Sequence, residues 1–281
     1  MINITRDYES VELEDNIESF EDDYNYSTKA LPNNRDNLIS FFGNAITICQ
    51  WWSFDLTEEN KQKSIKALKL AAKAGEAIFR LGREPEKEQR VVIDDILDAT
   101  YNGKSLLWDG RLDAIRWQQA FFCAAIVREQ AAMDSLAKFP VSVMRQCSTT
   151  NSEAEYALVE LIQGIQRRVS NDEGLALLGK ALEEVRLETK DPWVSYCTGG
   201  KTNFVLAFMM DGEVTPSTAL ADALNDSWEY HERFCDMGYQ QPDFYMPIVL
   251  LGLACIAKDL GNELNVQSDF IPQFYIDGDY L

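Results

Sequence analysis

The chain has 281 residues, of which 46% are hydrophobic and 11% aromatic, values that are ordinary for a folded protein. Its 26 Lys and Arg residues against 46 Asp and Glu residues give a formal net charge of −20. This charge excludes a nucleic-acid binder that works by neutralising phosphates, and it disfavours an anionic membrane surface. A chain of this length can bury a full hydrophobic core without disulfides or metal ions.

The negative charge is concentrated at the two ends of the chain. Residues 1–24 hold nine acids against one base, and residues 201–281 hold thirteen acids against three bases. A helix is predicted over about residues 7–24, with a thin apolar seam that includes Ile17 and Phe20. Two interpretations of this charge stay open: a directed negative surface for a basic partner, or a solvated face that only aids solubility.

Apolar residues then recur at helical spacing through the first half of the chain. The predicted helices cover residues 36–53, Thr57 as N-cap to Gly82 as C′ residue, Pro85 to about Ala99, and Leu112 to Leu136. The two glycines within residues 101–110 indicate a loop.

The second half of the chain shows the same helical spacing. The predicted helices lie near residues 140–147, 152–168, 172–188, 192–210, from Thr215-Pro216 to Gly238, and over 247–260. No run alternates with period two for long enough to predict a strand. We therefore expect an all-α protein of about ten helices, stacked as antiparallel helical hairpins and tetratricopeptide-like without a regular repeat. No linker divides residues 1–281, so a single domain is predicted.

Cysteine usage and hydropathy predict the compartment. The six cysteines are scattered with no Cys-x-x-Cys pair, which favours reduced thiols. The longest apolar run, residues 246–257, is short of the ~20 residues that cross a bilayer. The N-terminus has no apolar leader. A cytoplasmic location is expected.

A search for catalytic chemistry finds no assembled constellation. His231 lies on a largely apolar helical face, which favours a buried core residue over a catalyst. Residues 195–202 end like a phosphate-binding loop, but Ser195 stands where that motif requires Gly, and no strand precedes it. Adjacent acids such as Asp94 and Asp95 point about 100° apart on a helix. No catalytic residue, cofactor or metal site is predicted.

Two stretches carry a family resemblance. Residues 114–133 form an apolar, Trp-containing helix that leads into Arg128-Glu129-Gln130 and then to Pro140. Residues 247–261 form a small-residue helix that ends in Lys-Asp-Leu-Gly, and residues 266–272 follow it. In this order, over about residues 36–276, the chain resembles the immunity 49 family. The acidic helix at about 7–24 falls outside the resemblance.

The resemblance implies an antitoxin of a bacterial polymorphic-toxin or contact-dependent system, with type VI secretion as the expected route. Such a protein is not an enzyme and neutralises a cognate toxin domain by direct binding. The net charge favours a basic toxin face, as a nuclease presents. Two alternatives stay open: a carboxylate-based or metal-dependent hydrolase that reverses the toxin's modification, and a helical scaffold.

The acidic ends supply the candidate partner contacts, because charged rims around aromatic anchors are typical of tight interfaces. The candidates are Glu12, Asp15, Glu18, Asp22, Tyr24, Tyr26, Asp269, Tyr275, Asp277 and Asp279. The predicted partner is a basic cognate toxin domain, with no nucleic acid and no membrane. The sequence does not indicate an oligomeric state.

Overall fold

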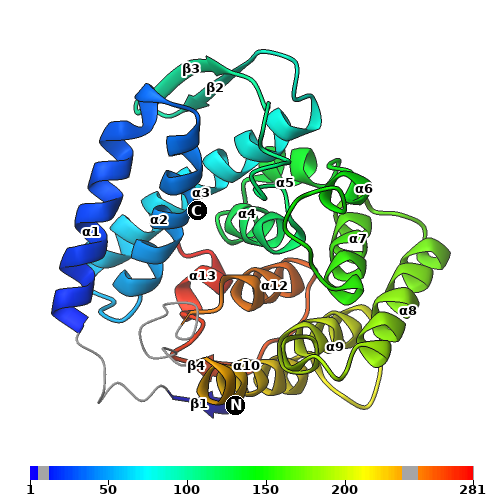
Figure 1. Cartoon of the computed structure of the whole chain (residues 1–281). Helices are drawn as coiled ribbons and strands as arrows, with labels where there is room; N and C mark the ends of the chain where they lie inside the picture. Colours follow the sequence, from blue (N-terminus) through cyan, green and yellow to red (C-terminus); the bar gives the residue numbers. More distant parts are fainter. Residues whose placement is uncertain (6–12, 236–245, 281) are drawn as a thin grey trace. The chain divides into compact units, whose positions relative to one another are not determined.

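A computed structural model of the chain describes residues 1–5, 13–235 and 246–280 (Figure 1). These residues are mostly helical, which confirms the predicted all-α class. Within them, no helix has the length and apolar character needed to cross a membrane. Backbone contacts divide the chain into two compact units, Glu12–Asn151 and Ser152–Leu281 with Met1–Val11. The prediction of one domain stays a prediction.

The unit Glu12–Asn151 is a set of helices with one β-hairpin. Its elements are α1 (Leu13–Ala30), η1 (Leu31–Asn33), α2 (Asp36–Trp52), α3 (Glu58–Arg83), β2 (Gln89–Ile93), β3 (Leu97–Tyr101), α4 (Ala114–Ile126), α5 (Gln130–Leu136) and α6 (Val141–Met144). Helix α3 packs against both α2 and α4, and α1 packs against α2. Buried aromatic rings fill the interior of this unit, as where Phe79 of α3 contacts Phe139, after α5, edge to face with ring centroids 5.0 Å apart.

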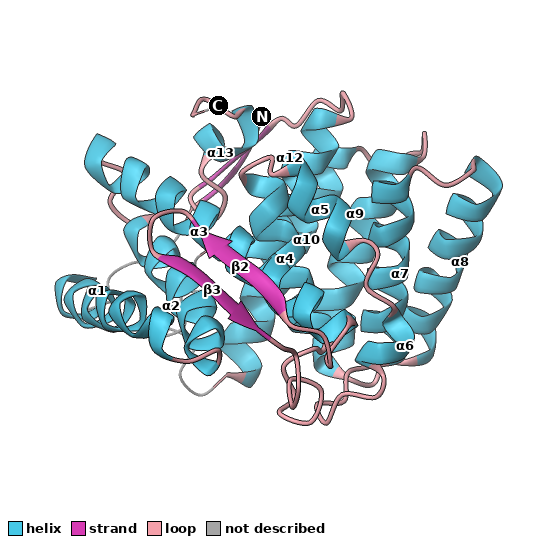
Figure 2. Cartoon of the chain, turned by 90° about the horizontal axis from the view of Figure 1, so that it is seen from above, coloured by secondary structure: helices cyan, strands magenta, loops and turns pink. Residues whose placement is uncertain are grey.

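The second unit is built from helical hairpins and a short parallel strand pair. Its elements are β1 (Ile2–Ile4), α7 (Glu153–Arg167), α8 (Asn171–Leu187), the π-helix η2 (Trp193–Thr198), α9 (Gly199–Met209), α10 (Pro216–Phe234), α12 (Ile248–Asp259), β4 (Val266–Ser268) and α13 (Gln273–Asp277). Figure 2 shows α7, α8 and α9 side by side, and α9 packs on α10. Strand β1 pairs with β4, so the first residues of the chain lie against its last part.

Four helices begin at hydroxyl caps, of which the sequence predicts Thr57 and Thr215. The Oγ atoms of Thr57, Ser152, Ser170 and Thr215 each accept a hydrogen bond from the backbone N–H three residues later. Pro216 occupies the first turn of α10, where its missing N–H costs nothing. Helix α10 ends at Phe234, followed by extended Cys235, and so stops before its predicted end at Gly238, which itself lies outside the described residues. Helix α1 continues beyond its predicted end to Ala30.

The predicted helix from Pro85 to Ala99 is wrong. Residues 89–101 form the antiparallel hairpin β2–β3, whose first strand contacts α3. Val91 and Ile93 are buried while Val92 between them is 49% exposed. That alternation is only five residues long, too short for the sequence pattern to identify. Asp94 adopts a left-handed φ of 42° in the turn, which a continuous helix excludes.

The predicted continuous helix from Leu112 to Leu136 is also wrong. Arg128 has a left-handed φ of 54°, and this residue separates α4 from α5. Its side-chain Nη1 donates to the carbonyl of Ile126 at 2.8 Å, which satisfies one acceptor at the end of α4. The apolar spacing persists across the break because both helices face the same core.

Gly82 has a different role from the predicted C′ residue. It lies inside α3, and a Cβ there would come within 2.5 Å of Leu112 Cδ1. Glycine at this position leaves room for the Leu112 side chain, which would have to shift if a Cβ were present, and it does not form a left-handed turn.

Candidate partner-binding site

Helix α1 presents the predicted acids to solvent. Asp15, Glu18 and Asp22 are exposed, and none of them forms an ion pair or side-chain hydrogen bond within the described ranges. The opposite side of the helix holds α1 on α2, because Phe20 stacks on Trp51 with centroids 5.8 Å apart. Glu12 lies outside the described residues. These acids of α1 therefore form a negatively charged face that no base among the described residues neutralises.

The two tyrosines of α1 differ in their surroundings. Tyr24 is half-buried and packs on Phe41 and Trp52, at centroid distances of 5.8 and 6.2 Å. Burial raises the pKa of its phenol, which marks a packing role. Tyr26 is 75% exposed and remains the candidate aromatic anchor of this helix.

The C-terminal candidates divide in the same way. Asp269 and Asp279 are exposed, whereas the Asp277 carboxylate lies 3.5 Å from Lys258 Nζ. Tyr275 is 0% exposed, so it belongs to the packed interior and cannot anchor a partner at the surface. Because α1 and these residues fall in different units, a common surface formed by both ends stays a prediction.

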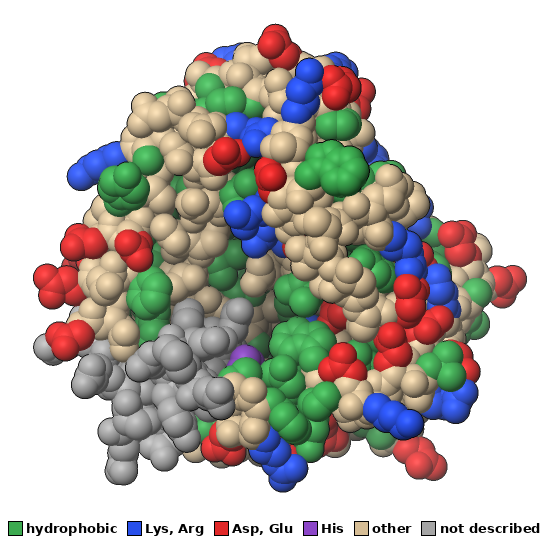
Figure 3. Space-filling view, viewed as in Figure 1, with side chains coloured by type: hydrophobic (Ala, Val, Ile, Leu, Met, Phe, Trp, Pro, Cys, Tyr) green, Lys and Arg blue, Asp and Glu red, His purple; other side chains and the backbone are tan. Residues whose placement is uncertain are grey.

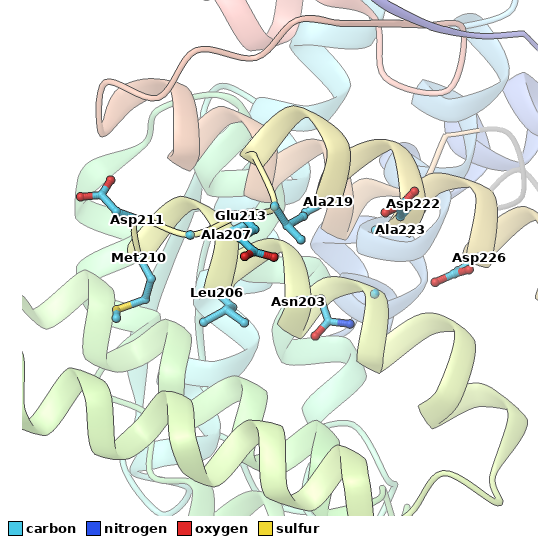
Figure 4. Close-up of a pocket in the computed structure, with 13 residues that line it drawn as sticks. Asn203, Leu206, Ala207, Met210, Asp211, Glu213, Ala219, Asp222, Ala223 and Asp226 are labelled. Atoms are coloured by element: carbon cyan, nitrogen blue, oxygen red, sulfur yellow. The ribbon is translucent and has the colours of Figure 1, made fainter.

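A groove lies between α9 and α10 in the second unit. It encloses about 550 Å³, within the ~300–1,000 Å³ typical of ligand pockets. Leu206, Ala207, Ala219 and Ala223 supply apolar lining, and the segment that joins the two helices closes one end. Figure 4 shows that its polar side chains come from both helices and from this connection.

Every charged side chain that lines this groove is an acid: Asp211, Glu213, Asp222 and Asp226. None of the four forms an ion pair or side-chain hydrogen bond in the described part of the chain. Burial raises the pKa of the Asp226 carboxyl, and the neighbouring acids Asp222 and Glu229 raise it further. The groove therefore has an uncompensated negative potential.

An aromatic cluster lies on η2 and the C-terminal half of α10. Tyr230 contacts Trp193 edge to face at a centroid distance of 5.3 Å and Phe234 at 5.5 Å, and Tyr196 lies 5.9 Å from Phe234. Phe234 is 48% exposed, and Arg233 Nη1 donates to Tyr196 Oη at 3.2 Å. Figure 3 shows hydrophobic side chains gathered at the surface beside the single histidine. Aromatic residues and Arg are the residue types enriched at binding hot spots.

A buried carboxylate fixes η2 in place. Glu155 of α7 is 1% exposed, and its Oε1 accepts hydrogen bonds from Trp193 Nε1 at 2.7 Å and from Thr198 Oγ1. Lys201 Nζ lies 3.6 Å from the same oxygen and 4.9 Å from the centre of the Trp193 ring. These contacts join α7, η2 and α9, and they hold the Trp193 end of the aromatic cluster.

The segment that ends like a phosphate-binding loop is therefore structural. Ser195 lies in the π-helix and Lys201 in α9, with no strand before them. A Cβ at Gly200 would lie 3.1 Å from the backbone of Ala223, so glycine permits α9 and α10 to approach closely. Gly200 thus serves helix packing, whereas the sequence favoured a Gly-Gly break within or beside a helix.

His231 is buried, and burial lowers its pKa to about 4. The imidazole is therefore neutral near pH 7. Among the described residues, no group of three or more His, Cys, Asp or Glu side chains could hold a metal ion. The four groove carboxylates illustrate this, because Figure 4 shows them spread along the groove without a common focus.

Sequence reasoning missed the groove acids and the aromatic cluster. The charge count identified the acidic C-terminal third of the chain, but it singled out only residues after 268 there. The spacing of Tyr230 and Phe234, and of Asp222 and Asp226, four residues apart on one helix, was the available signal. That Asp211 and Glu213, in the connection between α9 and α10, line the same groove is visible only in the structure.

These features define a mostly helical protein with an acidic face, an acidic groove and a partly exposed aromatic cluster. The family described as immunity protein 49 matches residues 55–275, and the chain belongs to this family. It is therefore an immunity protein. Comparisons with curated proteins and with solved structures give no match. The matched range contains the groove and the aromatic cluster, whereas α1 lies outside it.

Proposed function

We propose that this immunity protein neutralises a cognate toxin domain in the cytoplasm by direct stoichiometric binding. Its acidic surface occupies a basic face of the toxin, such as the phosphate-binding face of a nuclease. Membership of the immunity protein 49 family supports the antitoxin role. The choice of a basic toxin face rests on the charge of this chain.

The main support for the proposal is a set of acidic side chains that have no cationic neighbour among the described residues. Asp15, Glu18 and Asp22 on α1 and the four groove acids make no ion pair within the described ranges. Many other surface acids of the chain are neutralised locally, as Glu59 is by Lys63 and Glu183 by Arg186. Uncompensated carboxylates attract a basic partner and accelerate its association.

An enzyme that reverses the toxin's modification is the second candidate. A carboxylate-based hydrolase needs acids that converge on one reacting atom or metal ion. The described acids form no metal-holding group, and those of the groove are spread along its length. This arrangement favours binding over hydrolysis. A scaffold role without a toxin is the third candidate.

The test is complex formation between the purified chain and the basic protein encoded by the adjacent gene. We expect a stable 1:1 complex by calorimetry, with an affinity that falls as the salt concentration rises. The absence of a complex would contradict the proposal. Protection of the toxin's target at substoichiometric amounts of the chain would instead support the enzyme.

A further inference from the structure

We propose that the groove between α9 and α10 receives a basic segment of the partner, with an arginine or lysine side chain between the groove acids. This inference deepens the proposed function and rests on it for the partner's identity as the toxin. It assigns the contact to one site within the range that matches the family.

The shape of the groove fits a long side chain that is apolar along its stem. Leu206 and Ala207 of α9 face Ala219 and Ala223 of α10, so the lining has small and aliphatic side chains. The methylene stems of arginine and lysine pack on such surfaces while the charged head reaches a polar rim. A volume of about 550 Å³ also leaves room for neighbouring residues of the inserted segment.

The charge of the groove selects a cation. Asp222 and Asp226 lie one turn apart on the same face of α10, and like charges at this spacing repel each other. Glu229, one turn further along, is neutralised by Arg233 of the same helix. The described residues provide no corresponding base for Asp222 and Asp226. A cationic side chain of the partner therefore neutralises Asp222 and Asp226, as Arg233 neutralises Glu229.

The arrangement excludes two other occupants. A divalent metal ion needs several carboxylates around one point, and the groove acids do not form such a group. A phosphate or carboxylate ligand would be repelled, because no base lines the groove. An extended cationic peptide satisfies carboxylates that are spread along a line.

The aromatic cluster extends the same surface. Asp226, Glu229 and Tyr230 follow one another along α10, so the groove leads towards Tyr230 and Phe234. Partly exposed rings beside paired charges provide an aromatic anchor, which the lining of the groove does not contain. The partner segment therefore has basic residues at the groove and an apolar residue near Phe234.

The test uses a peptide probe with the intact chain. The probe is a blocked hexapeptide with two arginines, and its control is the same peptide with citrulline, which keeps the shape and loses the charge. Two-dimensional NMR of the labelled chain is expected to show perturbed amides in α9, α10 and their connection with the arginine peptide only. Half-saturation is expected at about 1 mM or below, with weaker binding at high salt.

Three variants make the outcome specific. Asp222→Asn/Asp226→Asn removes two charges, and Asn203→Phe fills the groove from an exposed position of α9 without changing charge. Both are expected to weaken the peptide at least fivefold. Glu184→Gln/Glu263→Gln removes two charges of the same unit outside the groove lining and is expected to change affinity less than twofold.

Equal perturbation with citrulline, shifts scattered over the whole chain, or unchanged affinity in both groove variants would overturn the inference. Any of these results leaves the proposed function standing, because the toxin complex is measured separately. If the wild-type chain binds the peptide at the groove but forms no complex with the neighbouring gene product, the proposed function fails and the groove assignment stands.

Discussion

Trp193 of the π-helix donates its indole N–H to the buried carboxylate of Glu155 at 2.7 Å. The same carboxylate oxygen accepts from Thr198 and lies 3.6 Å from Lys201. One acid of α7 therefore holds three side chains of the π-helix and α9. Because π-helical turns are rarely stable alone, this contact explains how the segment keeps its shape.

Glu155→Ala is expected to destabilise the chain by about 3 kcal/mol. The change leaves the buried Lys201 ammonium and the part-buried Trp193 N–H without their acceptor, and breaking one partner of a buried pair is expensive. Urea unfolding followed by fluorescence measures the difference. The matched control is Glu160→Ala on the same helix, which removes a solvent-exposed pair with Lys180 and is expected to cost less than about 1 kcal/mol. Equal losses in both variants would contradict the role of Glu155.

Asp226→Asn is expected to stabilise the chain near pH 7 by about 0.5 kcal/mol, the size of a like-charge contact one helical turn apart. The folded-state pKa of Asp226 lies above its ordinary 3.8, so the folded chain holds this proton more tightly than the unfolded chain. Stability from this group is therefore lost as the pH rises through the raised pKa.

The gain from Asp226→Asn should correspondingly disappear below pH 3.8, where the carboxyl is protonated in both states. Thermal unfolding across this pH range measures it, as a shift of about 1–2 °C at neutral pH. The same variant is expected to weaken toxin binding. A residue that costs stability and adds affinity is typical of a binding site. Lower stability at pH 7 would contradict this account of the acid.

Replacing Asp15, Glu18 and Asp22 with their amides is expected to slow association with the toxin by about tenfold and to leave dissociation nearly unchanged. Exposed charges act mainly on the rate of encounter. Stopped-flow mixing at low salt measures both rates. The charge-matched control replaces Glu84, Glu86 and Glu88, which are exposed in the loop before β2. If both sets of substitutions slow association equally, the effect depends only on net charge and the α1 face has no specific role.

Phe234→Ala is expected to weaken the toxin complex by at least tenfold, because a central aromatic anchor typically contributes more than 1 kcal/mol. The ring is 48% exposed in the chain alone, so the free energy of unfolding should change little. Calorimetric titration and urea unfolding give the two values. Leu187→Ala, a 60% exposed position at the end of α8, is the control and should affect neither. Unchanged affinity for Phe234→Ala would remove the aromatic cluster from the interface.

The sequence predicts helices well where a cap and a long apolar face agree. Thr57 and Thr215 begin helices as hydroxyl caps, as predicted. It fails at the β2–β3 hairpin, where five alternating residues are too few, and at Arg128, where the apolar pattern continues through a break. In both cases contacts with α3 and with the shared core determine the backbone conformation. The local spacing of apolar residues gives no information about those contacts.

Residue order alone determined the helical class, the main helix starts and the immunity family, because each depends on periodicity and motifs within short stretches of chain. Only the tertiary structure decided that Tyr275 is buried, that Glu155 holds the π-helix, and that acids from α10 and the preceding connection line one groove. Burial and the pairing of charges depend on which distant residues meet, and that is a property of the packed chain.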